Sequence, residues 1–319
     1  MTNILITGAN GFVGSALVLK LAAIETGVIR IAIRKPTRIF PNKVEIFEDL
    51  ELSDNTDWTD ALKNIDIVIH CAARAHLLKD NANDPLAEFR KVNTVGTLNF
   101  AQQAALAGVK RFIFISSLGV NGAETFSKPF LADDSPHPHS PYAQSKFEAE
   151  SGLIDLSRTT KMSVVIVRPP LVYGPKAPGN FGVLMRVVNR RIPLPFGRVT
   201  NKRSFVFLDN LIDLISICIT HPNAANQIFL VSDDEDLSTT QLLEKMGNVF
   251  NKSTMLLPIP MFFLNTAAKL AGKTKVAQQL LGSLQVDIEK TKSLLGWSPP
   301  FSVDEGLRKT ADISTESGQ

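Results

Sequence analysis

Residues 3–14 read NILITGANGFVG, a short apolar run followed by evenly spaced glycines. The apolar run predicts a buried β-strand, and Gly8, Gly11 and Gly14 lie where that strand would pass into a helix. Their spacing is a variant of the Gly-x-Gly-x-x-Gly turn that binds dinucleotides. Glycines let the backbone approach a pyrophosphate and aim helical N–H groups at it. The stretch therefore predicts a nucleotide site; the alternative is a purely structural turn.

The first 170 or so residues continue this alternation of short β-branched runs with helical patterns. The runs are apolar throughout, as expected for strands covered by helices on both faces. We therefore expect an α/β fold with a Rossmann-type doubly wound parallel sheet. The expected strands are residues 3–9, 29–34, 43–48, 66–73, 111–117 and 162–170.

The composition changes after Pro170, where prolines and glycines cluster in residues 168–180 and 190–197. A strand–helix–strand pattern returns further on, which indicates that a second, smaller α/β domain is interleaved with the first. We predict a dinucleotide-binding domain at 1–172 with 203–232 returning to it, and a second, substrate-binding domain at 173–202 and 233–319.

A basic cluster ends the second predicted strand. Arg34, Lys35 and Arg38 stand where NAD-binding folds carry an acidic residue that hydrogen-bonds the adenosine ribose. Their positive charge would attract the additional 2′-phosphate of NADP, so the pattern favours NADP over NAD; the alternative is a solvated basic turn. The expected cofactor contacts are Gly8, Gly11, Phe12, Val13, Gly14, Arg34, Lys35, Arg38, Asp49, Leu50, Ala72, Ala73 and Lys146.

Residues 140–150, SPYAQSKFEAE, place Tyr142 four positions before Lys146, on one face of a predicted helix. Ser117 ends a predicted strand and would lie at the same edge of the sheet. A free tyrosine has a pKa of about 10, which a neighbouring ammonium and a cationic nicotinamide would lower. We interpret Tyr142 and Lys146 as an acid–base pair, with Ser117 orienting the substrate oxygen. The alternative is an accident of an amphipathic helix.

Taken together, these residues resemble the extended short-chain dehydrogenase/reductase family of NAD(P)-dependent nucleotide-sugar epimerases and dehydratases, particularly its UDP-glucose 4-epimerase-like members. The resemblance spans nearly the whole chain. The motifs that carry it are TGANGFVG (7–14), VIHCAA (68–73), VNTVGTLN (92–99), ISSLGVNG (115–122), YAQSK (142–146), RPPLVYGP (168–175), RSFVFLDN (203–210) and LGWSPP (295–300).

The resemblance implies that Ser117, Tyr142 and Lys146 are catalytic and that Lys146 also holds the nicotinamide ribose. It implies a UDP-sugar substrate, and a homodimer through helices 86–107 and 142–155. Substrate contacts are implied for Asn180 and Phe181 near the sugar, for Pro193, Leu194, Pro195 and Phe196 around the uracil, and for Arg203 on the pyrophosphate.

The sequence departs from the 4-epimerase pattern in three places. Arg34 replaces the acidic ribose ligand, and Asn121 stands where the epimerases usually carry tyrosine. An Arg-Pro-x-Asp segment expected before residue 284 is missing, so Lys273 or Lys275 is expected to supply a phosphate contact.

The basic pocket bears on the type of reaction. A net reductase consumes NADPH, whereas an epimerase returns the same hydride to its substrate. We therefore predict an NADP(H)-dependent 4-keto reductase of a UDP-sugar, of the UDP-N-acetylquinovosamine type that serves bacterial surface polysaccharide synthesis. The first alternative is a UDP-hexose or UDP-N-acetylhexosamine 4-epimerase. A further alternative is a dinucleotide-sensing regulator, which would bind cofactor without turnover.

The overall composition supports no nucleic-acid or metal partner. The chain has 319 residues with 34 Lys and Arg against 31 Asp and Glu, and no dense basic block. Cys71 and Cys218 lie in apolar runs and are predicted to be buried small hydrophobic residues. The pair His137 and His139 is expected to lie in a solvated loop, because no further ligand cluster accompanies it.

We expect a cytoplasmic protein without a signal peptide, since no basic region and apolar stretch open the chain. Residues 255–272 are apolar but interrupted by two prolines, a lysine and an asparagine, so we expect no integral membrane segment. A helix beginning at Met261 could present Phe262 and Phe263 to a membrane surface; the alternative is core or subunit packing.

Overall fold

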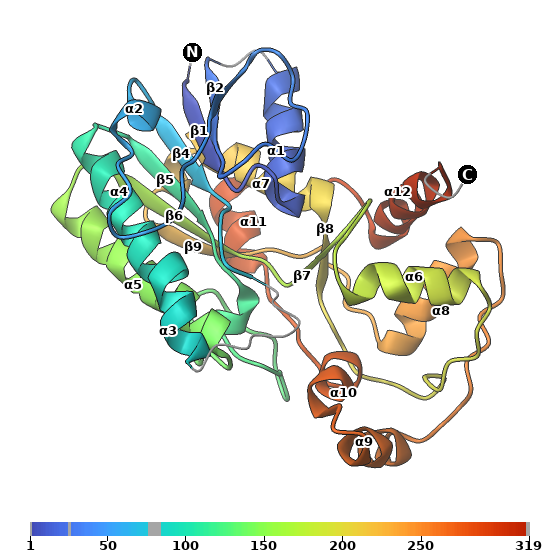
Figure 1. Cartoon of the computed structure of the whole chain (residues 1–319). Helices are drawn as coiled ribbons and strands as arrows, with labels where there is room; N and C mark the ends of the chain where they lie inside the picture. Colours follow the sequence, from blue (N-terminus) through green and yellow to red (C-terminus); the bar gives the residue numbers. More distant parts are fainter. Residues whose placement is uncertain (1, 25–26, 76–83, 317–319) are drawn as a thin grey trace.

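The computed structural model describes residues 2–24, 27–75 and 84–316, without the side chains of Asn180, Lys275 and residues 312–316. At its centre lies a parallel sheet with the strand order β3-β2-β1-β4-β5-β6-β9 (Figure 1). This confirms the predicted doubly wound sheet, with β1 and β4 at the point where the strand order reverses. The strands are β1 (Ile4–Thr7), β2 (Ile29–Ala32), β3 (Val44–Phe47), β4 (Ile67–His70), β5 (Arg111–Ile115), β6 (Ser163–Arg168) and β9 (Gln227–Leu230).

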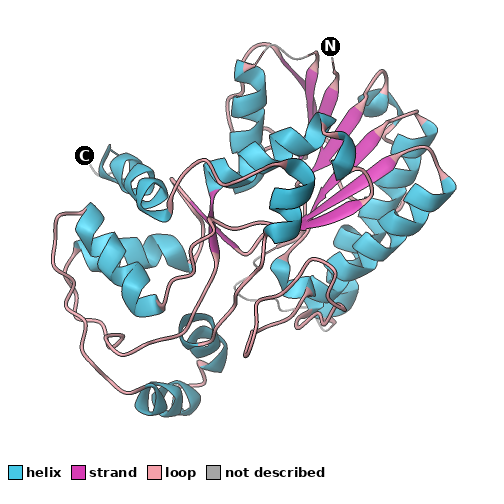
Figure 2. Cartoon of the chain, turned by 180° about the vertical axis from the view of Figure 1, so that it is seen from behind, coloured by secondary structure: helices cyan, strands magenta, loops and turns pink. Residues whose placement is uncertain are grey.

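Helices cover both faces of this sheet (Figures 1 and 2). Because side chains alternate along a strand, Ile4 and Ile6 of β1 pack into one core while Leu5 packs into the other. The first core is closed by α1 (Phe12–Ala23), α7 (Leu208–Thr220) and α11 (Glu289–Leu295). The second is closed by α2 (Thr59–Leu62), α4 (Thr97–Leu106) and α5 (Pro141–Thr159).

A smaller lobe stands beyond the carboxyl ends of the strands (Figure 1). It has its own core, which contains Tyr173, Phe181, Phe207 and Leu307. Its domain limits stay a prediction. The elements of the lobe are β7 (Leu171–Tyr173), β8 (Phe205–Phe207), α6 (Asn180–Asn189), α8 (Thr239–Val249), α9 (Met261–Leu270), α10 (Thr274–Leu281) and α12 (Val303–Glu316).

Short connecting elements complete the chain. α3 (Pro85–Phe89) and a π-helical turn, Arg90–Gly96, precede α4, and 3₁₀ turns occupy Leu118–Val120 and Pro222–Ala224. Within the described part of the chain, no helix is long and apolar enough to cross a membrane.

Candidate active site

The glycine-rich turn brings backbone from three segments together. Gly8 has a φ of +73°, and a Cβ there would lie 2.6 Å from the backbone nitrogen of Ala72. A Cβ on Gly14 would overlap the carbonyl oxygen of Gly8. Gly11 caps α1, whose first turn contains no acidic residue. The turn therefore presents the N–H groups of Phe12 and Val13 at an uncharged helix start, which suits a pyrophosphate.

A depression of about 550 Å³ continues from this turn. Asn10 Nδ2 donates to the carbonyl oxygen of Lys35 at 2.8 Å, and Arg38 Nη1 donates to Ser15 Oγ at 3.0 Å, so the basic cluster lies against the start of α1. The depression contains carboxylates as well as cations. Its lining residues are Asn10, Arg34, Lys35, Thr37, Asp49 and Glu51.

The other expected cofactor contacts follow β3 and β4. Asp49 has a φ of +59° and is exposed, whereas Leu50 packs against the second core. Ala72 and Ala73 are half-buried after β4. The glycine cradle, this depression and these small residues fit a dinucleotide, with each contact still a prediction.

His70, at the end of β4, is fully buried between two hydroxyl groups. Its Nδ1 lies 2.6 Å from Thr7 Oγ1 and its Nε2 lies 3.0 Å from Thr97 Oγ1. Burial lowers its pKa well below the usual range, with a smaller contribution from Lys146. His70 is a satisfied core histidine.

Two of the expected catalytic residues, Ser117 and Lys146, lie at the carboxyl end of β5, and Tyr142 lies one helical turn before Lys146 in α5. Helix α5 begins beside them because Ser140 accepts the N–H of Ala143 at 3.2 Å and Pro141 opens the first turn. Lys146 is 1% exposed, and its Nζ donates to the carbonyl oxygen of Ile115 at 2.9 Å. Ser117 Oγ accepts the N–H of Gly119 at 3.1 Å.

Burial perturbs both members of the acid–base pair. It lowers the pKa of Lys146 to about 8, an effect that Cys71 and Glu150 partly offset. It raises the pKa of Tyr142 to about 12. In the protein alone, desolvation of Tyr142 therefore dominates, while the Lys146 ammonium donates to Ile115. The expected lowering of the tyrosine pKa, which includes a cationic nicotinamide, stays a prediction.

The π-helical turn fixes the loop after β4 against α5. Asn93 Oδ1 accepts the N–H of Arg74 at 2.8 Å, and Asn93 Nδ2 donates to Ser145 Oγ at 3.1 Å. The ring of Phe89, one residue before the turn, packs edge-on to Tyr142 with centroids 5.9 Å apart. Such turns recur at functional sites, and this one holds the face that carries Tyr142.

A buried ion pair beneath the site was not predicted. Arg168 Nη2 lies 2.6 Å from Glu150 Oε2, and both side chains are at most 2% exposed. Arg168 Nη1 donates to Asn121 Oδ1 at 3.0 Å, and Ser116 Oγ donates to Glu150. The sequence contains one indication of this ion pair: Glu150 lies four residues after Lys146, on the same face of the helix. Asn121, noted as a departure from the epimerase pattern, is thus a partner of Arg168.

The predicted substrate residues all lie in the smaller lobe. Phe181 is 3% exposed, and its ring stacks on Tyr173 with centroids 5.0 Å apart, so its side chain belongs to the core of the lobe. Arg203 Nη1 donates to the carbonyl oxygen of Gly282 at 3.0 Å, and burial lowers its pKa. Asn180 begins α6, but its side chain lies outside the described part.

The predicted uracil segment, Pro193–Phe196, forms a strap. Leu194 donates its N–H to the carbonyl oxygen of Met255 at 2.9 Å and accepts the N–H of Leu257 at 2.8 Å. Leu194, Pro195 and Phe196 are half-buried, whereas Pro193 is exposed. Lys273 is exposed before α10, and the side chain of Lys275 is not described.

Within the described residues, no group of His, Cys, Asp and Glu is arranged to hold a metal ion. Cys71 and Cys218 are free thiols, and burial raises the pKa of each to about 12. His137 and His139 are exposed, and His139 Nδ1 lies 3.1 Å from the carbonyl oxygen of Gly119.

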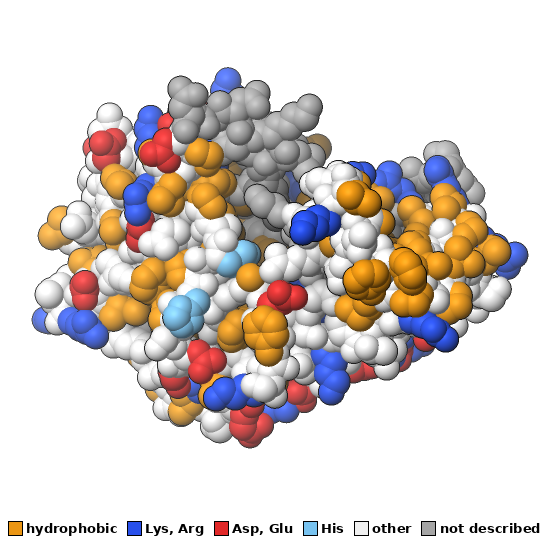
Figure 3. Space-filling model, turned by 90° about the horizontal axis from the view of Figure 1, so that it is seen from below, with side chains coloured by type: hydrophobic (Ala, Val, Ile, Leu, Met, Phe, Trp, Pro, Cys, Tyr) orange, Lys and Arg blue, Asp and Glu red, His pale blue; other side chains and the backbone are white. Residues whose placement is uncertain are grey.

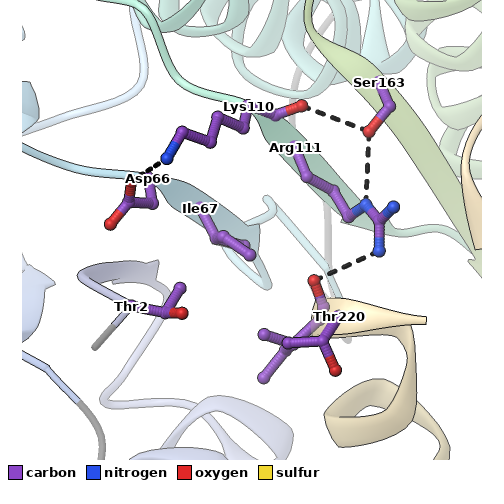
Figure 4. Close-up of a pocket in the computed structure, with 8 residues that line it drawn as sticks. Thr2, Asp66, Ile67, Lys110, Arg111, Ser163 and Thr220 are labelled. Atoms are coloured by element: carbon purple, nitrogen blue, oxygen red, sulfur yellow. Dashed lines mark hydrogen bonds and ion pairs between the residues drawn. The ribbon is translucent and has the colours of Figure 1, made fainter. Parts of the chain in front are cut away.

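A second depression, of about 230 Å³, lies among residues at the amino ends of the strands (Figure 4). Its cations have partners within the chain. Lys110 Nζ lies 2.8 Å from Asp66 Oδ1, and Arg111 Nη1 donates to the carbonyl oxygen of Cys218 at 2.7 Å. It is remote from the expected catalytic residues, and we assign no ligand to it.

Comparisons with known proteins identify the family of this chain. The model of the NAD dependent epimerase/dehydratase family matches residues 4–232. A UDP-glucose 4-epimerase of Vibrio cholerae is 46% identical over 313 residues, 97% of this chain and 94% of that protein. An N-acetyl-alpha-D-glucosaminyl-diphospho-ditrans,octacis-undecaprenol 4-epimerase of Escherichia coli O157:H7 is 27% identical, over 97% of this chain and 94% of that protein.

Solved structures share the fold. The UDP-glucose 4-epimerase of Thermotoga maritima with UDP-glucose has a TM-score of 0.79 at 22% identity, covering 100% of both chains. The UDP-glucuronic acid 4-epimerase of Bacillus cereus in complex with NAD has a TM-score of 0.80 at 21% identity, again over 100% of both chains. With the family model matching more than half of its length, the chain belongs to the NAD-dependent epimerase/dehydratase family.

Proposed function

We propose that this protein is a 4-epimerase of a UDP-hexose or UDP-N-acetylhexosamine. The observation that carries the proposal is the 46% identity to a UDP-glucose 4-epimerase, supported by Ser117 just after β5 and by Lys146 Nζ, which donates to Ile115 at the end of that strand. The relatives and structures named above are 4-epimerases of UDP-sugars or of a lipid-linked sugar, which supports this reaction over a net reduction.

The cofactor would be held by the glycine turn at Gly8, Gly11 and Gly14, by the depression beside Arg34, and by Lys146. When bound, its nicotinamide supplies a reversible hydride acceptor for C4 of the sugar. Tyr142 takes the proton of the C4 hydroxyl group as the C–H bond breaks, and returns it when the 4-keto sugar is reduced from its other face. Ser117 donates a hydrogen bond to the C4 oxygen throughout.

The protein alone holds Tyr142 in its protonated form, since burial raises the pKa to about 12. Activation therefore requires cationic charge close to the phenol when the site is filled. Lys146 has a pKa of about 8 and sits on the same helix face, so a modest rearrangement of its Nζ away from Ile115 would supply that charge. The dry surroundings that oppose ionisation in the empty site would strengthen this attraction.

A second candidate is the NADP(H)-dependent 4-keto reductase. The observation that favours it is the basic cluster Arg34, Lys35 and Arg38, which suits a 2′-phosphate. We place it second because Asp49 and Glu51 line the same depression and suit the ribose hydroxyl groups of NAD.

The test uses the purified full chain. With NAD and UDP-glucose or UDP-N-acetylglucosamine, an epimerase yields the C4 epimer without net change of cofactor, and Tyr142→Phe abolishes the product. With NADPH and a UDP-2-acetamido-4-keto-6-deoxyhexose, a reductase consumes NADPH in proportion to the sugar, which would overturn the proposal. Cofactor binding without either turnover would indicate the regulator.

We also propose a homodimer through the α4 and α5 face. Leu106 is 89% exposed and Val95 is 44% exposed, so this face offers apolar side chains to a second copy. Sedimentation velocity tests it: the wild type should sediment as a dimer and Leu106→Glu as a monomer. A monomeric wild type would contradict this assignment without affecting the proposed reaction.

A further inference from the structure

Helix α9 is not packed into a hydrophobic core. None of its ten residues is buried, and Phe262, Phe263 and Leu270 are 73%, 61% and 86% exposed. An isolated helix of this length is marginal in water, so α9 gains little stability from its own hydrogen bonds. Two adjacent exposed phenylalanines on such a helix indicate a surface that is covered in use.

Neighbouring segments extend this surface. The strap at Leu194 pairs with residues 255–257, which places exposed Ile192 close to exposed Met255 and Leu257. Figure 3 shows hydrophobic side chains gathered on the smaller lobe, with Lys and Arg side chains at their margin. We call this the α9 surface; it comprises Ile192, Met255, Leu257, Phe262, Phe263, Leu270 and Val276.

The charge around the α9 surface is mainly positive. The sequence contains no Asp or Glu from residue 245 to residue 286. Lys269 in the last turn of α9 and Lys273 before α10 are both exposed, as are Arg191 and Arg198 on the strap. The acidic neighbour that the hydrogen bonds record is Glu124, which accepts from Gln278 Nε2 at 3.2 Å in α10.

We propose that the α9 surface docks on an anionic lipid bilayer. Phenylalanine and leucine side chains of a short amphipathic helix enter the boundary between headgroups and acyl chains, while flanking lysines and arginines approach the lipid phosphates. Long basic side chains reach the headgroups while their stems stay apolar. Docking would place the smaller lobe at the membrane without any segment crossing it.

A second copy of the chain fits this surface less well. A twofold interface brings the same patch of both copies together, so the lysines of both copies, Lys269 and Lys273, would gather at one interface to which residues 245–286 contribute no acidic side chain. An anionic bilayer supplies the opposite charge over the whole surface. The inference does not depend on which UDP-sugar reaction the site performs.

The test is sedimentation of the full chain with vesicles. The wild type should pellet with phosphatidylglycerol–phosphatidylethanolamine vesicles and stay in solution with phosphatidylcholine vesicles. F262S/F263S should reduce the partition coefficient at least tenfold, and K269E/K273E should reduce it at low salt by about fivefold per charge. The matched control is L19S/K20E, which changes an exposed leucine and lysine of α1 and should bind as the wild type does.

Thermal unfolding and UDP-sugar turnover in solution verify that each variant is folded. The proposal is overturned if the wild type stays in solution with both kinds of vesicle, or if F262S/F263S binds as tightly as L19S/K20E. It is also overturned if the phenylalanine variant changes the sedimentation coefficient of the free protein while vesicle binding is absent. That last result would assign the surface to a second copy or another protein.

Discussion

Helices α5 and α9 show two ways of placing functional side chains. Along α5, Lys146 and Glu150 are both buried and bonded to other segments. Along α9, no residue is buried and the aromatic side chains point outward. The proposed proton transfer requires side chains held within about 0.5 Å of the reactive geometry, which the buried contacts of α5 favour. The proposed docking surface on α9 needs no such precision.

Substitutions at the two tyrosines of the chain test the site on α5 most directly. We expect Tyr142→Phe to lower kcat by about a thousandfold or more, because it removes the group that exchanges the proton. Its free energy of unfolding should change little, since no hydrogen bond from this hydroxyl group to a described residue is lost. Epimer formation, followed by NMR, and thermal unfolding measure the two effects.

Tyr173→Phe is the matched control. Tyr173 Oη donates to Asp233 Oδ2 at 2.8 Å in the core, where the carboxylate also accepts from Phe207 and Asn210. We expect a loss of about 1–3 kcal/mol in the free energy of unfolding with turnover largely retained. A thousandfold loss of turnover in this variant, or none in Tyr142→Phe, would contradict the assignment.

The buried ion pair beneath the site gives the next largest effect. Arg168→Ala leaves Glu150 charged and without its cation, so we expect the free energy of unfolding to fall by about 3–5 kcal/mol. The double variant Arg168→Met/Glu150→Leu should recover most of this loss, because neither charge is then left alone. Urea unfolding measures both.

An exposed pair on the same helix is the control. Arg158 and Asp155 are each 72% exposed and 3.0 Å apart, so Arg158→Ala should change the free energy of unfolding by less than about 0.5 kcal/mol. Equal losses in Arg158→Ala and Arg168→Ala would mean that burial does not set the strength of these pairs.

The lowered pKa of Lys146 predicts how the free energy of unfolding depends on pH. Its pKa falls from 10.5 to about 8 on folding, so between these values the unfolded chain binds more protons than the folded one. The cost of burying the charge, about 3 kcal/mol, is present below pH 8 and disappears as the pH rises toward 10.5. Wild type should therefore gain stability relative to Lys146→Met over this range.

Urea unfolding of both proteins between pH 7 and pH 10 measures the difference, which cancels contributions from other groups. Tyr142 acts in the opposite sense: its raised pKa of about 12 lowers stability as the pH rises above 10. A difference between the two proteins that stays constant over the range would show that Lys146 is not desolvated as the structure indicates.

The sequence was sufficient for the parts of the site that local patterns encode. Gly8, Gly11 and Gly14 follow one strand, and Tyr142 and Lys146 share one turn of helix, so spacing alone placed them. Parallel strands bring their carboxyl ends to one edge, which added Ser117.

The sequence did not predict the features that depend on tertiary packing. Arg168 meets Glu150 and Asn121 across 18 and 47 residues of chain. The strap at Leu194 pairs with Met255, which lies far along the chain. The raised pKa of Tyr142 comes from desolvation, which a spacing pattern does not report. Residue types and short intervals were predictable, whereas the environment of each side chain required the fold.

The smallest expected effect concerns α9 itself. Phe262→Ser removes a side chain that is 73% exposed, so we expect the free energy of unfolding to change by less than about 0.5 kcal/mol. Phe112→Ala, in β5 and within the second core, should cost about 3–5 kcal/mol because that ring is fully buried. Urea unfolding of the two variants in free solution compares them. A loss of more than about 2 kcal/mol in Phe262→Ser would mean that α9 is packed against the molecule in solution, since only a buried aromatic ring costs that much to remove.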